Sequence, residues 1–363
     1  MGSFRRTYNF AAGPATLPQE VLERARAGLA DWQDLGYSLL EAPFTGDEFK
    51  ALMETTQQQI RTALALPDHY HVLFLQGGAS AQFSLIPLNL LPPTATAGYV
   101  ETGHWSTRAF EEGQRYGPAQ VIASSRDSGF DRIPPVSQWA LSEHLHYCHI
   151  TPNETANGVQ FQSDPDCGSV PLIADMTSEF LSRPIDIKRY GMIYAGAQKN
   201  LGPTGLVIVI VREDLLGGAR PETPTVFNYQ LQIAQQSRIN TPLMFAVYLT
   251  HLMLVWLEEQ GGLKTVQAHN ISQSQSVYRL IDEDDFFHCP VIPEHRSVMN
   301  VCFSIRATQL TQRFLAEASA RGLVNLAGHS QAGGLRASLY NAQPDDAVSA
   351  LTSFMNDFRR RYG

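Results

Sequence analysis

Two short apolar runs on either side of one lysine constrain the fold most. Residues 191–194 (GMIY) and 206–211 (LVIVIV) are rich in β-branched side chains and bounded by glycine and proline, so both are predicted to be buried strands. Lys199 lies in the turn between them. An amine held there among glycine and alanine can lose part of its hydration, which lowers its pKa and lets it form a Schiff base. A solvent-exposed turn lysine is the alternative interpretation.

A carboxylate elsewhere in the chain favours the functional interpretation. Asp175 ends another apolar run, residues 170–174. Open α/β sheets bind ligands at the carboxyl ends of their strands, and an aspartate commonly pairs with the pyridinium nitrogen when a lysine binds pyridoxal phosphate. A lone aspartate at a strand end is more often a helix cap or turn residue. It is therefore the pair, Lys199 with Asp175, that predicts a cofactor.

A glycine-rich turn offers a place for a phosphate group. The predicted strand 71–75 runs directly into the turn 76–80 (QGGAS), and the following residues can start a helix. Such a junction points backbone N–H groups and the positive end of a helix dipole at an anion. Glycine-rich turns without this purpose are also common.

Composition excludes several classes of protein. With 363 residues, 44% hydrophobic and 17% charged, the chain has a globular composition and is long enough for two domains. The net charge of −8 argues against nucleic-acid binding. Its four cysteines are not spaced as zinc ligands or as a disulfide framework, so no metal site is expected. The longest apolar stretch, residues 244–257, contains His251 and is too short to span a membrane, which predicts a cytoplasmic protein.

Helical periodicity predicts several long helices. Thr16 with Gln19 has the pattern of a capping box, and Val21, Leu22, Ala25, Leu29 and Trp32 then recur on one face. Further helices are expected over residues 46–64, 243–258 and near the C-terminus. Beyond residue 262 the pattern changes to mixed strand and helix.

Six segments together resemble the phosphoserine aminotransferase family, a class V, fold-type I group of pyridoxal phosphate enzymes. The segments are residues 9–14, 76–83, 152–155, 182–186, 194–202 and 333–338, and the resemblance extends from about residue 9 to the C-terminus. It implies an α/β fold in which a large domain, residues 16–260, contains a mostly parallel seven-stranded sheet. A smaller α+β domain would comprise residues 1–15 and 261–363. It also implies a homodimer whose sites are completed across the interface.

The resemblance assigns roles to individual residues. Lys199 would bind the cofactor and move the proton between the substrate Cα and the cofactor C4′, while Asp175 would keep the pyridine nitrogen protonated. Trp105 would stack on the ring, although a lone tryptophan is often simply core, and Thr155 would donate to the phenolic oxygen. Arg336 would bind the substrate α-carboxylate. The cofactor phosphate would be held by Ala79, Ser80, Gln198 and, from the other subunit, Asn240 and Thr241.

The chain departs from the family where the distal anion of the substrate is bound. The family uses a His-Arg pair in the loop after the first helix and a second pair in the small domain, given across the dimer. Here Phe44 and Thr45 stand at the first pair, and His329 is followed by Ser330 at the second. Each lost arginine removes charge-assisted hydrogen bonds of about 1.5–3 kcal/mol.

This departure predicts a transaminase with a changed amino-acid substrate. The alternatives are an authentic phosphoserine aminotransferase of serine biosynthesis, in which another arginine such as Arg108 or Arg306 could compensate, a lyase or decarboxylase on the same fold, and a non-catalytic homologue. The substrates in the first two cases are an amino acid and a 2-oxo acid.

Overall fold

A seven-stranded sheet forms the centre of the molecule. The computed structural model describes residues 6–363. The strand order is β2-β8-β7-β6-β5-β3-β4. The strands are β2 (Tyr70–Gln76), β3 (Thr96–Glu101), β4 (Ala119–Ser124), β5 (Leu145–Ile150), β6 (Leu172–Asp175), β7 (Tyr190–Gly196) and β8 (Leu206–Arg212). The three strands predicted around Lys199 and before the glycine-rich turn are thus confirmed, each to within two residues.

The sheet is parallel except at β8. β8 pairs antiparallel with both β2 and β7, whereas β7, β6, β5, β3 and β4 pair with one another in parallel. β2 and β7 therefore run in the same direction on the two sides of β8. The carboxyl ends of all strands but β8 consequently meet at one edge of the sheet, which confirms the predicted mostly parallel topology.

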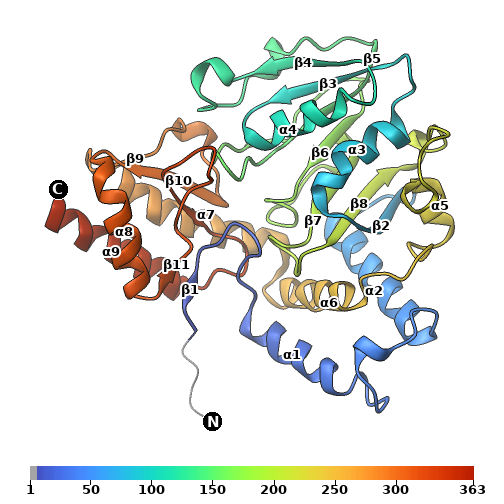
Figure 1. The fold of residues 1–363 in the computed structure, drawn as a ribbon, viewed down its shortest axis with the longest axis horizontal. Helices are drawn as coiled ribbons and strands as arrows, with labels where there is room; N and C mark the ends of the chain where they lie inside the picture. The colour runs from blue at the N-terminus through green and yellow to red at the C-terminus, as the bar shows by residue number, and fades with distance from the viewer. Residues whose placement is uncertain (1–5) are drawn as a thin grey trace.

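Both faces of the sheet are covered by helices (Figure 1). On one face lie α3 (Gly78–Leu90), α4 (His104–Gly113) and α5 (Tyr229–Ala234); on the other, α1 (Gln19–Ala30), α2 (Asp47–Leu64) and α6 (Met244–Glu259). The alternation along β8 shows why its sequence is apolar throughout, because Val207 and Val209 point into one layer of core and Ile208 and Ile210 into the other.

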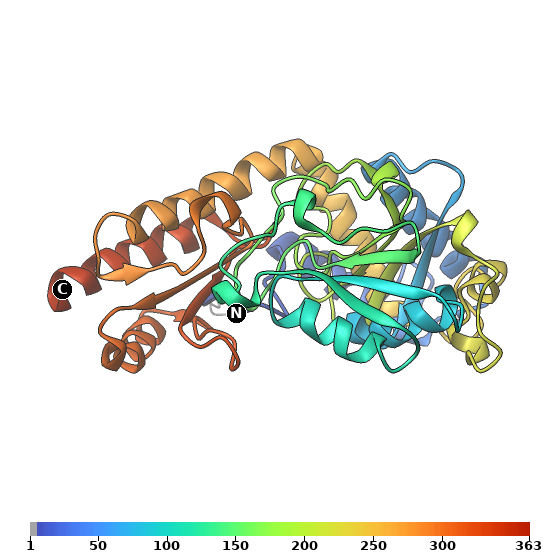
Figure 2. The ribbon, with the colours of Figure 1, turned by 90° about the horizontal axis from the view of Figure 1, so that it is seen from above.

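The C-terminal part of the chain forms a second, smaller unit of sheet and helix beside the large sheet (Figure 2). β9 (Phe287–His288), β10 (Asn300–Ile305) and β12 (Leu335–Ser338) form an antiparallel sheet, and α7 (Gly262–Ile281), α8 (Thr311–Ala320) and α9 (Asp345–Tyr362) pack with it. β1 (Tyr8–Asn9) pairs in parallel with β11 (Leu323–Val324), so the start of the described chain joins this unit. The domain boundary at residue 260 stays a prediction.

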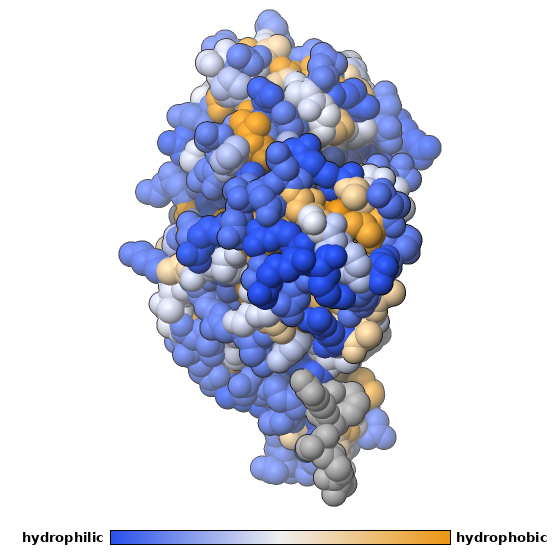
Figure 3. Space-filling view, turned by 90° about the vertical axis from the view of Figure 1, so that its left-hand side faces the viewer, coloured by the Kyte–Doolittle hydropathy of each residue, from blue (hydrophilic) through white to orange (hydrophobic). Residues whose placement is uncertain are grey.

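The outer end of this unit is mainly hydrophilic. Figure 3 views the molecule from that end and shows polar residues with only isolated hydrophobic patches between them. Within residues 6–363, none of the helices is both long and apolar enough to cross a lipid bilayer.

The first helix differs from its sequence prediction. Its N-cap is Pro18, without a side-chain capping hydrogen bond, because the Thr16 hydroxyl donates instead to the Asn9 carbonyl at 2.8 Å. Its buried residues are Val21, Ala25 and Gly28, whereas Leu22 and Leu29 are 36% and 38% exposed. The predicted capping box and part of the predicted stripe were therefore wrong. Packing against α6 selects a narrower face than the apolar pattern suggested.

Candidate active site

The predicted cofactor residues converge at the carboxyl edge of the sheet. Lys199 follows β7, Asp175 ends β6, Thr155 follows β5 and Trp105 follows β3. These strands lie in the order β7-β6-β5-β3, so the four side chains come from adjacent positions along one edge. This is where open α/β sheets bind ligands.

Lys199 lies in a polar pocket. Its Nζ donates to the Thr155 hydroxyl and, at 3.4 Å, to that of Ser178, and these two hydroxyls are 2.6 Å apart. Burial lowers the pKa of Lys199 to about 8, and the charge of Arg336 acts in the same direction, against Asp175 and Glu154. A larger fraction of this amine is therefore neutral at physiological pH than of an exposed lysine. A neutral amine is the form that can attack a carbonyl carbon.

Asp175 is buried and its orientation is fixed. The Thr177 backbone N–H donates to Asp175 Oδ1 at 3.0 Å, and the Thr177 hydroxyl donates to the same oxygen. Burial raises the pKa of Asp175, while its hydrogen bonds with Thr177 and the positive charge of Lys199 oppose that shift. Burial removes the water that would stabilise the Asp175 carboxylate. A positively charged ring beside the carboxylate would stabilise it instead.

A buried glutamate holds the start of α4, and with it Trp105. Glu154 accepts the backbone N–H groups of Trp105 and Ser106, at 3.0 and 2.8 Å. Any side chain on Gly103 would collide with Glu154, since a Cβ there lies 2.6 Å from its Cδ. Burial raises the pKa of Glu154 to about 6. The indole is thereby placed so that the Lys199 Nζ lies 5.7 Å from its ring centroid.

The turn before α3 has the backbone of an anion site. Gly77 and Gly78 have φ values of +101° and +69°, which favour glycine, and α3 begins at Gly78 without a side-chain cap. The N–H groups of the first helical turn, which includes Ala79 and Ser80, have no partner within the helix. Gln76, at the end of β2, faces Leu206 in the pairing register, and Ala197 N donates to Leu206 O at 2.9 Å. The turn is therefore near the Lys199 turn.

Arg336 and His329 lie at the same site. Arg336 Nη1 donates to the Thr155 carbonyl at 3.1 Å. The His329 ring is 6.0 Å from the Trp105 ring and 4.6 Å from that of His104. His329 thus reaches the site of its own chain, whereas the resemblance implied a contribution across the dimer. A side chain on Gly328 would collide with the carbonyl of Gly333, so this glycine lets the loop fold back.

Five predicted residues form no hydrogen bond with Lys199, Asp175 or Arg336 within residues 6–363. Phe44 and Thr45 are in the turn between the 3₁₀ helix Leu39–Glu41 and α2. Asn240 and Thr241 are exposed, and the Thr241 carbonyl accepts from Gln76 Nε2 at 2.8 Å. Ser330 is also exposed, next to His329.

The chain matches known proteins along nearly its whole length. The family model described as aminotransferase class-V matches residues 7–351. The chain belongs to the class-V aminotransferase family. It is 47% identical to a phosphoserine aminotransferase of Nitrosomonas europaea, covering 99% of this chain and 100% of that one. It is 48% identical to a phosphoserine aminotransferase of Hahella chejuensis, over 98% and 99% of the two chains.

Solved structures agree with this membership. The phosphoserine aminotransferase of Bacillus circulans subsp. alkalophilus superposes with a TM-score of 0.97 at 43% identity, covering 99% of both chains. A pyridoxal phosphate-bound phosphoserine aminotransferase of Trichomonas vaginalis gives a TM-score of 0.93 at 37% identity, over 97% of this chain and 100% of that one. Membership confirms the predicted fold and the predicted enzyme, an aminotransferase, and with it the pyridoxal phosphate chemistry that the resemblance implied.

The site of this class-V aminotransferase has buried polar atoms that fit such a cofactor. Within residues 6–363, Trp105 Nε1, Gln198 Oε1 and Arg336 Nε are buried without a hydrogen-bond partner. Buried polar groups are usually paired, because an unpaired one costs about 1–3 kcal/mol. These three atoms near Lys199 are free to bond a polar molecule, so the residues present fit such a cofactor.

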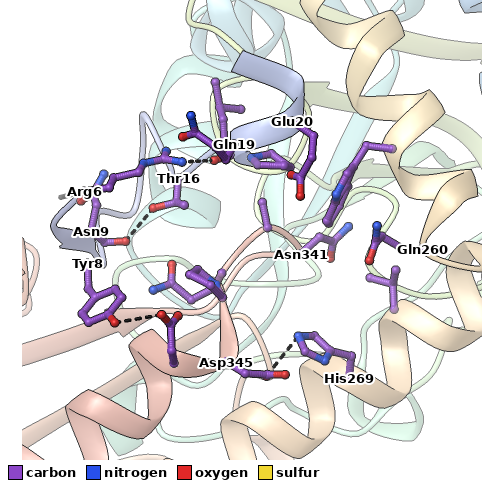
Figure 4. Close-up of a pocket in the computed structure, with 18 of the residues that line it drawn as sticks. Arg6, Tyr8, Asn9, Thr16, Gln19, Glu20, Gln260, His269, Asn341 and Asp345 are labelled. Carbon is purple, nitrogen blue, oxygen red and sulfur yellow. Dashed lines mark hydrogen bonds and ion pairs between the residues drawn. The ribbon is translucent and has the colours of Figure 1, made fainter. Parts of the chain in front are cut away.

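A cavity elsewhere in the described part of the chain lacks a lysine that could bind the cofactor. It has a volume of about 810 Å³ and lies between the N-terminal segment, α1, α7 and the start of α9 (Figure 4). His269 faces Asp345 across it at 3.5 Å, and Tyr8 donates to Asp346 at 2.9 Å. No lysine is among the described residues that line it. The carboxyl edge of the sheet therefore remains the candidate active site of this aminotransferase.

Sequence reasoning missed several residues that build the site. Glu154 was within a recognised motif, residues 152–155, but only Thr155 was selected from it. Ser178 and Thr177 follow Asp175 closely, and their small hydroxyl side chains in an otherwise apolar region were an available signal. His104 adjoins Trp105, yet its contact with His329 depends on the fold and had no local signature.

Proposed function

We propose that this aminotransferase transfers the amino group of phosphoserine to a 2-oxo acid. The observation that carries the proposal is the identity of 47–48% over 98–99% of the chain with proteins named phosphoserine aminotransferase. Conserved architecture supports it, since the solved structure at TM-score 0.97 is also a phosphoserine aminotransferase. This is the alternative to the changed substrate that the sequence departure favoured.

In this proposal the residues around Lys199 hold the cofactor. The N–H groups of Ala79 and Ser80 and the side chain of Gln198 would bind the phosphate, Trp105 would stack on the ring, and Thr155 would donate to the phenolic oxygen. Asp175 binds the pyridine nitrogen. Pyridoxal phosphate supplies an electron sink for the pair of electrons left at Cα when its proton is removed.

Lys199 acts as the base in the proposed reaction. Its neutral Nζ, favoured by a pKa of about 8, would take the proton from the substrate Cα and deliver it to the cofactor C4′. Arg336 binds the α-carboxylate and so fixes which substrate bond faces the base. Thr155 and Ser178 hold Nζ in place between the two steps.

We further propose that the enzyme is a homodimer. Asn240 and Thr241 are exposed in the single chain, and Phe44 and Thr45 form no hydrogen bond with Lys199, Asp175 or Arg336 within residues 6–363. In a homodimer, each subunit could contribute both pairs of residues to the active site of its partner.

A steady-state assay tests the proposed substrate. Holoenzyme is mixed with phosphoserine and 2-oxoglutarate, and kcat/KM is compared with a panel of neutral and acidic amino acids. We expect phosphoserine to be preferred, with kcat/KM on the order of 10⁴ M⁻¹s⁻¹ or above. Preference for another amino acid, with phosphoserine at least about a hundredfold worse, would reject the proposal.

One specific observation favours a second candidate, a transaminase with a changed substrate. Phe44, Thr45 and Ser330 occupy the positions of the family's distal-anion residues, and a dianion against the apolar Phe44 would lose hydration without compensation. The triple change Phe44→His, Thr45→Arg, Ser330→Arg separates the two candidates. Phosphoserine activity that is present only in the triple variant supports the changed substrate.

A further inference from the structure

The start of α4 places a second imidazole beside His329. His104 is the first residue of α4, and its ring centroid lies 4.6 Å from that of His329, with 42° between the planes. Both rings also contact Trp105, at 5.0 and 6.0 Å between centroids. Both histidines are half-buried. The pair therefore lies beside the indole that is proposed to cover the cofactor.

The backbone holds His104 firmly in this position. His104 N donates to Asn157 Oδ1 at 3.0 Å, and the next two N–H groups of the helix donate to Glu154. On the other side, the His329 carbonyl accepts from Ala332 N and Gly333 N, at 3.0 and 2.7 Å, which closes the loop that carries His329. Two rigid supports thus bring the imidazoles together.

The charges around the pair favour an anion. Burial lowers the pKa of His104, and the neighbouring Arg108 lowers it further, while Glu111 opposes. Burial also lowers the pKa of His329, with contributions from His104, Arg336 and Lys199. Among residues 6–363, the charged groups that act on the two rings are therefore Arg108, Arg336 and Lys199, with Glu111 as the one carboxylate. An anion bound here would relieve this repulsion and favour protonation of the imidazoles.

The two arginines considered as replacements differ in position. Arg306 follows β10 and forms an ion pair with Asp285 at 3.0 Å, on an exposed part of the C-terminal unit. Arg108 is one helical turn beyond His104 on α4 and is exposed, and among residues 6–363 it has no ion-pair partner. Arg108 can therefore add positive charge behind His104, whereas Arg306 is engaged elsewhere.

We propose that His104 is a specificity-determining residue that binds, together with His329, the distal anion of the substrate in place of the arginine that position 330 lacks. The inference rests on the proposed function, since it deepens the account of how phosphoserine is held. Arg108 strengthens the site without touching the anion. Because an imidazole binds an anion well only when protonated, binding takes up a proton and weakens as pH rises.

The experiment compares substrates with and without a distal anion. The holoenzymes of wild type, His104→Asn and His329→Asn are titrated with phosphoserine, glutamate and serine, following the cofactor absorbance for binding and product for kcat/KM. His144→Asn, an exposed histidine outside the site, is the matched control. We expect His104→Asn to lower kcat/KM for phosphoserine and glutamate by about tenfold and to leave serine within about twofold.

A pH series adds a readout that a merely structural role would not affect. Glutamate is used because its side-chain carboxylate stays ionised between pH 6 and 8. In wild type its apparent Kd should rise with pH over that range, and this dependence should be reduced in His104→Asn and unchanged in His144→Asn.

The outcomes separate this inference from the proposed function. If wild type prefers phosphoserine and His104→Asn keeps that preference, the function stands and the inference fails. An equal loss for all three substrates also overturns it, because His104 would then act only through Trp105. Wild type could instead prefer glutamate to both phosphoserine and serine. If His104→Asn then no longer prefers glutamate to serine, the inference stands and the proposed substrate fails. A wild type that does not distinguish anionic from neutral substrates rejects both.

Discussion

Lys199 has a lowered pKa, and its Nζ is held by the hydroxyls of Thr155 and Ser178. Replacing Lys199 is therefore the most direct test of the proposed catalytic base. Lys199→Ala removes the base and the attachment point for the cofactor but leaves Asp175, Trp105 and the turn before α3 intact. We expect transamination to fall by at least about a hundredfold, while cofactor still binds non-covalently. Borohydride should fix cofactor to the wild type and not to the variant, as measured by mass spectrometry. Residual activity near the wild-type level would contradict the role of Lys199.

Glu154 is the second residue whose role can be tested alone. In Glu154→Gln an amide replaces an oxygen that accepts a backbone N–H, so we expect a loss of about 1–3 kcal/mol in the free energy of unfolding at pH 7. Cofactor stacking should also weaken, because Trp105 is held by the same carboxylate. Chemical denaturation and the intensity of the cofactor circular dichroism provide the two measurements. Glu154→Asp, which keeps the charge, serves as the comparison.

The pH dependence of this effect has a definite sign. The pKa of Glu154 is raised from 4.5 to about 6 in the folded protein. A raised pKa means that its contribution to stability is fully present below about pH 4.5 and is lost as pH rises through about 6. The stability of wild type relative to Glu154→Gln should therefore fall by about 2 kcal/mol across that window. A difference that is independent of pH would show that Glu154 stays ionised throughout.

At the residue scale, the sequence was sufficient to predict the position of a side chain when that position depends only on the neighbouring strand and turn. Lys199 and Asp175 could be placed at strand ends because the flanking runs are apolar on both faces of the sheet. The contact of His104 with His329 could not be predicted, since it joins two units of the fold that are distant in the chain. The exposure of Leu22 and Leu29 was missed for a similar reason, because the packing of α6 decides which side of α1 is buried.

At the scale of elements, the junction of β2 and α3 connects backbone geometry with cofactor affinity. In Gly77→Ala the new Cβ would lie 2.8 Å from that of Ala81, and φ of +101° is unfavourable for alanine. We expect the first turn of α3 to shift and cofactor affinity to fall by about tenfold, or about 1.4 kcal/mol. Equilibrium dialysis with pyridoxal phosphate measures this.

Gly129→Ala is a matched control for that change. Gly129 also has a positive φ, +74°, but its Cβ would meet open space, and it lies in the loop after β4. It should lose about 1 kcal/mol of stability and keep cofactor affinity. If both variants lose cofactor equally, the effect comes from general destabilisation and not from the turn before α3.

At the scale of the whole molecule, one edge of the central sheet carries nearly all the residues proposed to act, and the proposed homodimer would bring the remaining ones to the site of the partner. The apolar runs predicted which segments are buried strands, whereas the mostly parallel sheet was an implication of the family resemblance, and the antiparallel pairing of residues 206–211 could not be read from their composition. A surface that would pair two copies could not be predicted from apolar patterning, since the exposed residues Asn240 and Thr241 are polar. Only a test of function in trans can assign them to a partner's site.

Subunit mixing provides that test. Asn240→Asp places a carboxylate near the proposed phosphate position and should weaken cofactor retention by like-charge repulsion. In a mixed dimer of Lys199→Ala and Asn240→Asp chains, one site would combine an intact Lys199 with an intact Asn240 from the other chain. If Asn240 acts in trans, co-expression should restore about half of the wild-type activity per mixed dimer, although each parent homodimer is impaired. If it acts within its own chain, both sites of the mixed dimer remain defective and activity stays at the mean of the parents. Sedimentation must show dimers in all three samples, and a fully active monomer would refute the proposed dimer outright.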